Sequence, residues 1–330
     1  MGPANFCHGS NDITVCRTLR ECAFLKAEQD FTNLLTNFTV NSFLLSQYRY
    51  LFQTFPSRRS VRHKLYIGVE AVRLLANYYA LKRSLNEFVA PAALLDGKKC
   101  TVILLSHNRP QNMRVLVEAA LKNAFVSKVI VSNSNRSVRI SDWIKINDPR
   151  LIMVDETKPT RPGHRFVLAE QAAGDYFISI DDDIFLTPQQ WAKFFGYLLA
   201  DETVPHGLTG NFYEPGTASS NGSPFYHVSD VNIEVDVLIG AYAFTRSHLN
   251  RFFELARRLN VGDVTDLANG EDVLLSFAGE QRPQIHDVGR VFCCASTSLE
   301  GVALWRTLHD FWNERISLFD RARSARTDMD

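Results

Sequence analysis

Between residues 97 and 184 the sequence alternates short apolar runs with amphipathic ones, and this alternation constrains the fold more than any other feature. Strands are predicted at 100–108, 128–135, 150–156 and 174–184, with helices at 113–123 and 166–173. A strand, a helix and another strand at this spacing form a βαβ unit with parallel strands. We therefore expect an α/β protein with a Rossmann-like, mostly parallel sheet flanked by helices.

Polar residues follow three of these predicted strands at the point where each ends. They are Ser106–Arg109, Asn133–Asn135 and Asp181–Asp183. Open α/β sheets bind their ligands at the carboxyl ends of the strands. The sequence therefore predicts that these three segments face one binding crevice.

The acidic triplet Asp181, Asp182 and Asp183 directly follows the buried run YFISI. Adjacent carboxylates repel one another, and a divalent cation such as Mn²⁺ or Mg²⁺ is their natural partner. Alternation along an extended chain places Asp181 and Asp183 on the same side, so one can hold the metal while the other acts through water or a ribose hydroxyl. The metal would neutralise a diphosphate leaving group. The alternative is an exposed acidic turn.

Composition and missing motifs exclude several classes. Lys+Arg and Asp+Glu both number 36, which disfavours a general nucleic-acid binder. The sequence contains neither GxxxxGK[ST] nor a GxGxxG after the first strand, which disfavours P-loop NTPases and dinucleotide-binding enzymes. Two other classes stay open. One is a metal-dependent phosphoesterase or nucleotidyltransferase that uses the Asp triplet, and the other is an interaction scaffold.

The pattern of apolar and polar residues divides the chain into three parts. They are an N-terminal helical region (1–97), the α/β region (98–319) and a charged tail (320–330) that is expected to fray. The helices of the first region could bind the acceptor, a membrane surface or a partner subunit, which includes oligomerisation. Its basic stretch Arg58–Lys64 is either an anion contact or a solvated turn. No apolar run reaches transmembrane length, so we expect a soluble protein, cytoplasmic unless a membrane anchor has been removed.

From about Cys100 to about Phe319 the chain resembles the exostosin-like glycosyltransferases, which build heparan-sulfate-type backbones and related glycans. The matching elements, besides the Asp triplet, are Ser106-His107-Asn108-Arg109, KVIV followed by asparagines, Thr160–Phe166, VDVLIGAYAFTRSHL (235–249), Asn269–Asp272 and LWRTLHDFWNER (304–315). The chain departs from the family at His107, where Tyr is usual, at Glu271, where Asp is usual, and at Trp305, where His is usual. The resemblance implies a GT-A fold over 98–319 and transfer of an N-acetylhexosamine from a UDP-sugar, with retention.

Roles for the donor site follow from the residue types and this resemblance. Arg109 and Arg165 would contact the nucleotide or its diphosphate. Asp181 and Asp182 would hold ribose and donor sugar, and Asp183 the metal. Asn133 and Asn135 have two interpretations: they hydrogen-bond the base or ribose of the nucleotide, or they close a turn. Gly240 also has two: it lets the backbone approach the donor closely, or it allows tight packing in a strand.

The reacting centre is predicted around Asp272. In an inverting enzyme Asp272 would be the general base, and in a retaining enzyme it would orient the donor or stabilise an oxocarbenium ion. The alternative is a cap for a helix over 273–280. Glu271 is its companion, Arg306 would stabilise the departing diphosphate, and His309 would ligate the metal or touch phosphate. The acceptor is unassigned among glycans, lipids, proteins and modified nucleic-acid bases.

Overall fold

The computed structural model describes residues 79–86, 95–214, 224–294, 305 and 308–327. The chain divides into two compact units, Met1–Arg49 and Tyr50–Asp330, and every described residue belongs to the second. Most of the helical region expected at 1–97, including Arg58–Lys64, therefore lies outside the described residues. Of that region, residues 79–86 form a helix.

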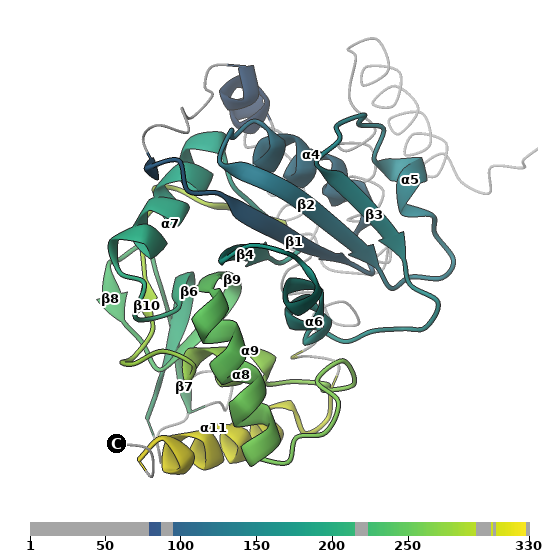
Figure 1. Ribbon diagram of the computed structural model, residues 1–330. Helices are drawn as coiled ribbons and strands as arrows, with labels where there is room; N and C mark the ends of the chain where they lie inside the picture. Colours follow the sequence, from purple (N-terminus) through teal and green to yellow (C-terminus); the bar gives the residue numbers. More distant parts are fainter. Residues whose placement is uncertain (1–78, 87–94, 215–223, 295–304, 306–307, 328–330) are drawn as a thin grey trace, which may run out of the picture. The chain divides into compact units, whose positions relative to one another are not determined.

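A nine-stranded sheet forms the centre of the described part (Figure 1). Along the sheet the order is β3-β2-β1-β4-β9-β6-β10-β8, and β7 pairs with β6. The strands are β1 (Cys100–Ser106), β2 (Val126–Asn133), β3 (Leu151–Asp155), β4 (Tyr176–Ile180), β6 (His206–Tyr213), β7 (Phe225–Ser229), β8 (Ile233–Glu234), β9 (Val237–Thr245) and β10 (Gln284–Ile285).

The first four strands of the sheet are parallel, as the βαβ pattern predicts. Strand β9 then runs antiparallel to both β4 and β6, and β10 returns to the direction of β6. Every residue of β4 is buried, because this strand lies in the middle of the sheet with helices on both faces. The predicted α/β class with a helix-flanked, mostly parallel sheet is confirmed.

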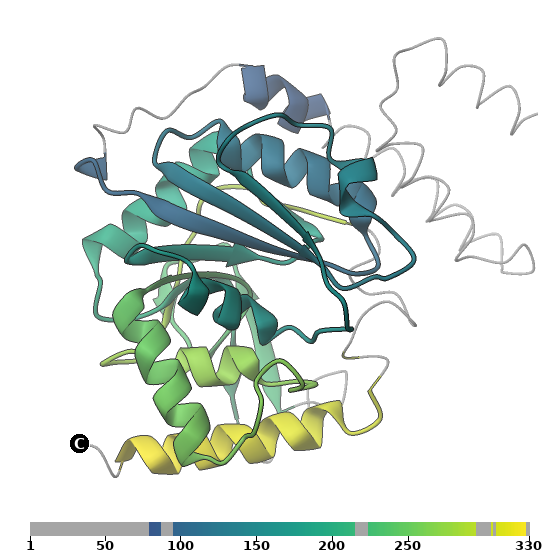
Figure 2. The ribbon, with the colours of Figure 1, turned by 45° about the vertical axis from the view of Figure 1, so that its right-hand side comes forward.

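Helices cover both faces of the sheet (Figure 2). Helices α6 (His164–Gln171), α8 (Arg246–Arg258), α9 (Glu271–Ser276) and α11 (Phe311–Thr327) share one apolar core with β9. Helices α4 (Pro110–Leu121), α5 (Ile140–Trp143) and α7 (Pro188–Ala200) lie on the other face. A separate two-stranded sheet pairs β5 (Ile184–Phe185) with β11 (Phe292–Cys293) beside the Asp triplet.

Helix α11 differs from the fraying tail expected at 320–330, because it continues to Thr327. Phe319 and Ala322 are buried in the core that α11 shares with α8 and α9. The guanidinium of Arg321 also donates to the carbonyl of Leu259 at the end of α8. The apolar face of the helix therefore outweighs the charges that made this segment look solvated. Within the described ranges, no helix has the length and apolar character needed to cross a membrane.

Candidate functional site

The three polar segments predicted at strand ends do meet at one edge of the sheet. Ser106 of β1 stands opposite Asn133 of β2, and the Asp triplet follows Ile180 at the end of β4. The backbone N–H of Asp181 donates to the carbonyl of Gly240 over 2.7 Å, which joins the triplet to β9. The parallel strands therefore determine the location of the site, and β9 closes its far side.

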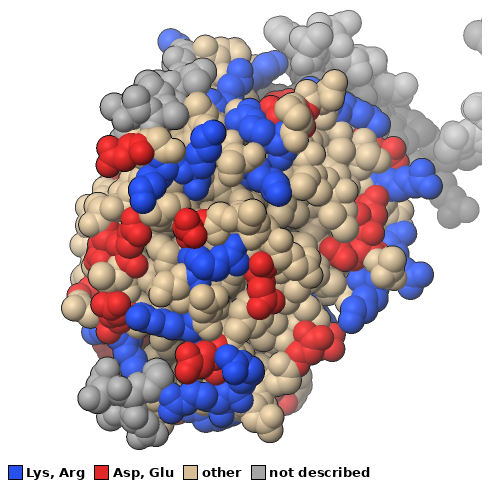
Figure 3. All heavy atoms as spheres, viewed as in Figure 1, with Lys and Arg blue, Asp and Glu red and all other residues tan. Residues whose placement is uncertain are grey.

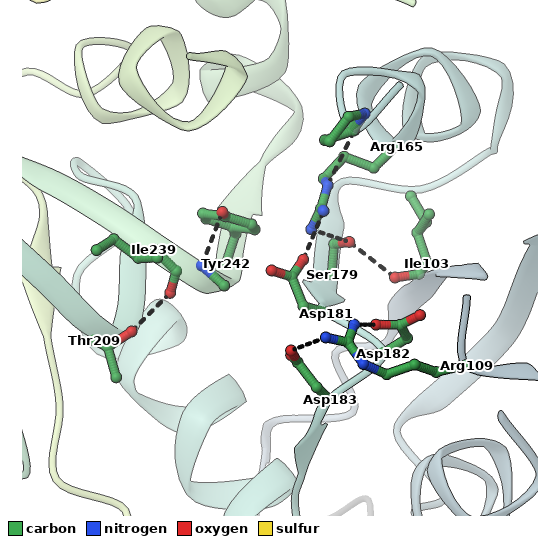
Figure 4. Close-up of polar contacts among 12 residues, drawn as sticks. Ile103, Arg109, Arg165, Ser179, Asp181, Asp182, Asp183, Thr209, Ile239 and Tyr242 are labelled. Atoms are coloured by element: carbon green, nitrogen blue, oxygen red, sulfur yellow. Dashed lines mark hydrogen bonds and ion pairs between the residues drawn. The ribbon is translucent and has the colours of Figure 1, made fainter. Parts of the chain in front are cut away.

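Two buried arginines bind the three carboxylates of the triplet (Figure 4). The guanidinium of Arg109 donates to Asp182 Oδ1 at 2.5 Å and lies 3.0 Å from Asp183 Oδ2. The guanidinium of Arg165 donates to Asp181 Oδ1 at 2.7 Å. Burial raises the pKa of Asp182, and the positive charge of Arg109 opposes that rise. The triplet is thus an ion-paired cluster and not an exposed acidic turn.

A second buried ion pair lies at the start of α9. Arg315, from α11, donates from Nη1 to Asp272 Oδ1 and from Nη2 to Asp272 Oδ2, both at 2.7 Å. Its neighbour Glu271 is buried as well, and burial together with the negative charge of Asp272 raises the pKa of Glu271 to about 7. The two adjacent carboxyl groups therefore differ: Asp272 is ion-paired with Arg315, whereas Glu271 is buried with a raised pKa.

Tyr242 and Arg165 connect the two ion-paired clusters. The Arg165 guanidinium lies 5.0 Å from the centre of the Tyr242 ring. The Tyr242 hydroxyl accepts from the N–H of Gly240 over 2.9 Å. Burial raises the pKa of Tyr242, and the charges of Asp272 and Asp181 add to that rise. The clusters therefore form one electrostatic unit.

This unit carries more negative than positive charge. Within the described part of the chain its five carboxyl groups face three guanidinium groups, so carboxylates outnumber guanidinium groups by two when all are ionised. The carboxyl groups are Asp181, Asp182, Asp183, Glu271 and Asp272, and the guanidinium groups are Arg109, Arg165 and Arg315. Excess charge inside a protein is stabilised by a counter-ion. Among the residues that the structure describes, no group of three or more His, Cys, Asp or Glu side chains is placed to hold a metal ion, so a cation there would need further ligands from a bound molecule.

Comparison with known proteins finds structural likeness without sequence relatives. No known family and no curated protein matches the sequence. A structure of GalNAc-T7 with UDP, GalNAc and Mn²⁺ matches at a TM-score of 0.47 and 11% identity, over 68% of this chain and 48% of that one. Residues 1–349 of S. aureus TarS in complex with UDP-GlcNAc match at 0.39 and 15%, over 59% of this chain and 57% of that one.

A CMP:2-keto-3-deoxy-manno-octonic acid synthetase complexed with CTP matches at a TM-score of 0.33 and 14% identity, over 48% of this chain and 78% of that one. The chain spans about half the length of the GalNAc-T7 and TarS structures. All three TM-scores are low, so a functional assignment has to rest on the residues of the site.

The two asparagines predicted to contact a base or to close a turn are engaged within the protein. The amide of Asn133 donates to the carbonyls of Asn135 and Val138 and to Asp155 Oδ1. The amide of Asn135 donates to the carbonyl of His107. Both contact patterns are those of a turn that braces the loop after β2.

The remaining predicted residues have different positions. Gly240 has φ +70°, so its backbone conformation favours glycine, and a Cβ there would lie 2.8 Å from Ile184 Cδ1, the movable end of that side chain. The side chain of His309 is 98% exposed and, within the described part of the chain, pairs with its neighbour Asp310, so the structure does not bring it to the triplet. Arg306 lies outside the described residues.

Arg315 and Tyr242 belong to the site but were not singled out in the sequence. Arg315 had a detectable signal: it lies four residues after Phe311 and four before Phe319, on the stripe of α11 that packs against the core. A charged residue on a buried helical stripe indicates an ion pair with another element. Tyr242 had no such signal, because an aromatic residue inside an apolar strand is ordinary core composition.

Proposed function

We propose that this chain is a metal-dependent glycosyltransferase of the GT-A type that takes its sugar from a UDP-sugar. The observation that carries the proposal is the Asp triplet at the carboxyl edge of the parallel strands, where three carboxylates are paired with two buried guanidinium groups. An N-acetylhexosamine as the sugar, and retention at its anomeric carbon, are supported by the resemblance to the exostosin-like enzymes.

In the proposed enzyme two carboxylates of the triplet would hold a divalent cation together with phosphate oxygens of the nucleotide. Arg165 binds Oδ1 of Asp181, while Oδ2 lies on the side of Gly240 and Tyr242 (Figure 4). A Cβ on Gly240 would come within 3.6 Å of this oxygen, so the glycine keeps the space beside it open. Carboxylate oxygens are the ligands that Mg²⁺ and Mn²⁺ prefer. Asp181 and Asp183 would hold the ion, which would supply charge neutralisation for a diphosphate leaving group.

The ion pair of Asp272 favours an orienting or electrostatic role for this residue. Both of its carboxylate oxygens accept from Arg315, so an acceptor hydroxyl would have to compete with the bidentate guanidinium for this carboxylate. An inverting enzyme with Asp272 as general base would need this pair to open. A retaining enzyme needs no such base, and its developing positive charge at the sugar would be stabilised by a fixed carboxylate.

The face of the molecule drawn in Figure 3 does not suggest a large polyanionic acceptor. On the face shown in Figure 3, basic and acidic side chains are interspersed, in keeping with the zero net charge of the chain. A polyanion would favour a face dominated by Lys and Arg. We therefore propose to screen uncharged glycan and lipid acceptors first.

Calorimetry with UDP, GDP and their sugar conjugates, with and without Mn²⁺, tests the donor assignment. We expect metal-dependent binding of UDP, lost in Asp183→Asn and kept in the matched variant Asp142→Asn, whose carboxylate is exposed on α5. Absence of nucleotide binding in the unmodified protein would refute the proposal. Product analysis then separates the reaction classes, because a nucleotidyltransferase or phosphoesterase would release phosphate or pyrophosphate and transfer no sugar.

A further inference from the structure

A second polar cluster lies at the same edge of the sheet, between β2, β3 and α6. Ser132 Oγ in β2 donates to Glu156 Oε1 over 2.6 Å, and Nε2 of His164, at the start of α6, lies 2.9 Å from the same oxygen. Ser132 is buried, and the side chains of His164 and Glu156 are 12% and 17% exposed. The roles assigned above use none of these three residues.

The hydrogen bonds of Glu156 occupy one of its two oxygens. A carboxylate only accepts hydrogen bonds, so Nε2 of His164 carries the hydrogen in this contact. Oε1 thus receives two donors, whereas Oε2 accepts no hydrogen bond from any residue that the structure describes. The backbone N–H of Glu156 donates to the carbonyl of Asn133 over 2.8 Å and fixes the residue at the end of β3. Oε2 is therefore a positioned acceptor at the carboxyl edge of the sheet.

Consecutive residues of α6 connect this cluster to the Asp triplet. His164 contacts Glu156, and its neighbour Arg165 donates to Asp181 Oδ1. Along the sheet β1 separates β2 from β4 (Figure 1), so the two clusters stand two strand spacings apart, roughly 10 Å along the edge. The base of a nucleotide whose phosphates lie at the triplet can therefore extend along this edge to Glu156.

The amides predicted to contact the base are engaged by the protein itself. Asn133 donates to acceptors of its own loop, and Asn135 donates to the carbonyl of His107. The edge pyrimidine N–H of uracil, at N3, needs one acceptor, which Oε2 of Glu156 provides. Guanine presents two adjacent N–H donors, which call for both oxygens of a carboxylate, but Oε1 is already occupied. The single available oxygen therefore fits uracil.

We propose that Glu156 determines the base specificity of the donor site, with its Oε2 accepting the N3–H of uracil. This inference rests on the proposed function and adds the group that selects the base. A hydrogen bond to an ionised carboxylate is among the stronger ones in proteins. Cytosine has an unprotonated N3, so two acceptors would face each other with no hydrogen between them, and both would stay unsatisfied. Glu156 therefore favours uracil and rejects cytosine.

Glu156→Gln reverses the polarity of this contact because the orientation of the new amide is determined by its neighbours. Ser132 and His164 both donate to the inner oxygen, so the amide oxygen of glutamine takes that position. The amide NH₂ then takes the place of Oε2 and presents a donor to the base. A donor suits N3 of cytosine and opposes the N3–H of uracil.

Calorimetry with UDP and CDP, both with Mn²⁺ present, measures the preference for uracil. We expect the unmodified protein to bind UDP about tenfold or more tightly than CDP, in line with a hydrogen bond to a charged group. Glu156→Gln should lower this ratio by about tenfold or more. The matched variant Glu170→Gln, at an exposed position of α6, should leave it unchanged. A purely structural role of Glu156 would weaken both nucleotides alike, and an unchanged ratio would overturn the inference.

N3-methyluridine diphosphate tests the same contact in the unmodified protein, so the inference stays testable if Glu156→Gln fails to fold. Its methyl group replaces the N3–H, and it should bind about tenfold or more weakly than UDP. The control 5-methyluridine diphosphate keeps the N3–H and should bind about as tightly as UDP. Equal binding of UDP and the N3-methyl compound would overturn the inference and leave the proposed function intact. Binding of no nucleotide at all would overturn both.

Discussion

Replacing Arg315 by methionine should destabilise the fold by about 3–5 kcal/mol, the range found when one partner of a buried ion pair is removed. The Arg315 and Asp272 side chains are 4% and 8% exposed, and two bonds of 2.7 Å join them. Methionine fills much of the space of the aliphatic stem but supplies no charge. Asp272 would then be a buried carboxylate without its counter-ion.

The same helix offers a matched control. Arg323 pairs with Asp320 at 2.9 Å, but these side chains are 56% and 44% exposed. Exposed pairs contribute about 0–1 kcal/mol, since water solvates both charges when the pair is broken. Arg323→Met should therefore cost far less than Arg315→Met, although both changes remove an ion-paired arginine from α11.

Guanidinium denaturation of the four proteins of a double-mutant cycle measures the effect. Asp272→Asn combined with Arg315→Met should recover part of the loss seen in Arg315→Met, because the unpaired charge is gone. A loss in Arg315→Met no larger than that of Arg323→Met, or a double variant less stable than the sum of the single changes, would refute the reasoning. Either result would mean that Asp272 finds water or another cation once Arg315 is absent.

Three further outcomes follow from the described residues. Burial raises the pKa of Glu271 from 4.5 to about 7, so the native state binds this proton more tightly than the unfolded chain does. The free energy of unfolding should therefore fall as the pH rises from 4.5 to about 7. Glu271→Gln should remove this pH dependence in denaturation experiments. Gly240→Ala should cost about 1–2 kcal/mol from the strain of a positive φ, plus a smaller cost for displacing Ile184 Cδ1, which the added Cβ would approach to 2.8 Å. Gly97→Ala, with φ +69° and nothing within 4 Å, isolates the φ contribution and should cost about 1–2 kcal/mol in the same thermal or chemical denaturation. Because burial lowers the pKa of His286 from 6.5 to about 4, stability should be lost as pH falls through that range, and His286→Phe should flatten this limb.

The parallel half of the fold was predictable because its signals are local. Strands β1, β2, β3 and β4 each lie within a few residues of a predicted run, and the helices between them set a parallel direction. The direction of β9 was not predictable, since an apolar run reads the same in either orientation. In α11 the spacing of Phe311, Arg315 and Phe319 is visible in the sequence, but the charges after residue 319 conceal that the helix continues to Thr327.

The site was predictable only as far as strand ends reveal it. Asp181 and Asp183 directly follow a buried strand, and this pattern can be recognised from a single short segment of the sequence. The pairing of Arg109 with Asp182 spans 73 residues and that of Arg315 with Asp272 spans 43, so neither has a local signature. Asn133 shows the reverse case, because a polar residue at a strand end is equally suited to bind a ligand or to brace a loop.

Because Arg315 comes from the last helix of the described chain, the order of biosynthesis matters for this protein. When the ribosome has made the parallel strands, β9 and α9, Asp272 still lacks its counter-ion, and the face that α11 covers is still open. Domains fold as units as they emerge, and exposed apolar faces on incomplete chains promote aggregation. A nascent chain that stops before residue 315 therefore has most of its sheet but cannot complete its core, so truncated products should be substrates for chaperones and proteases.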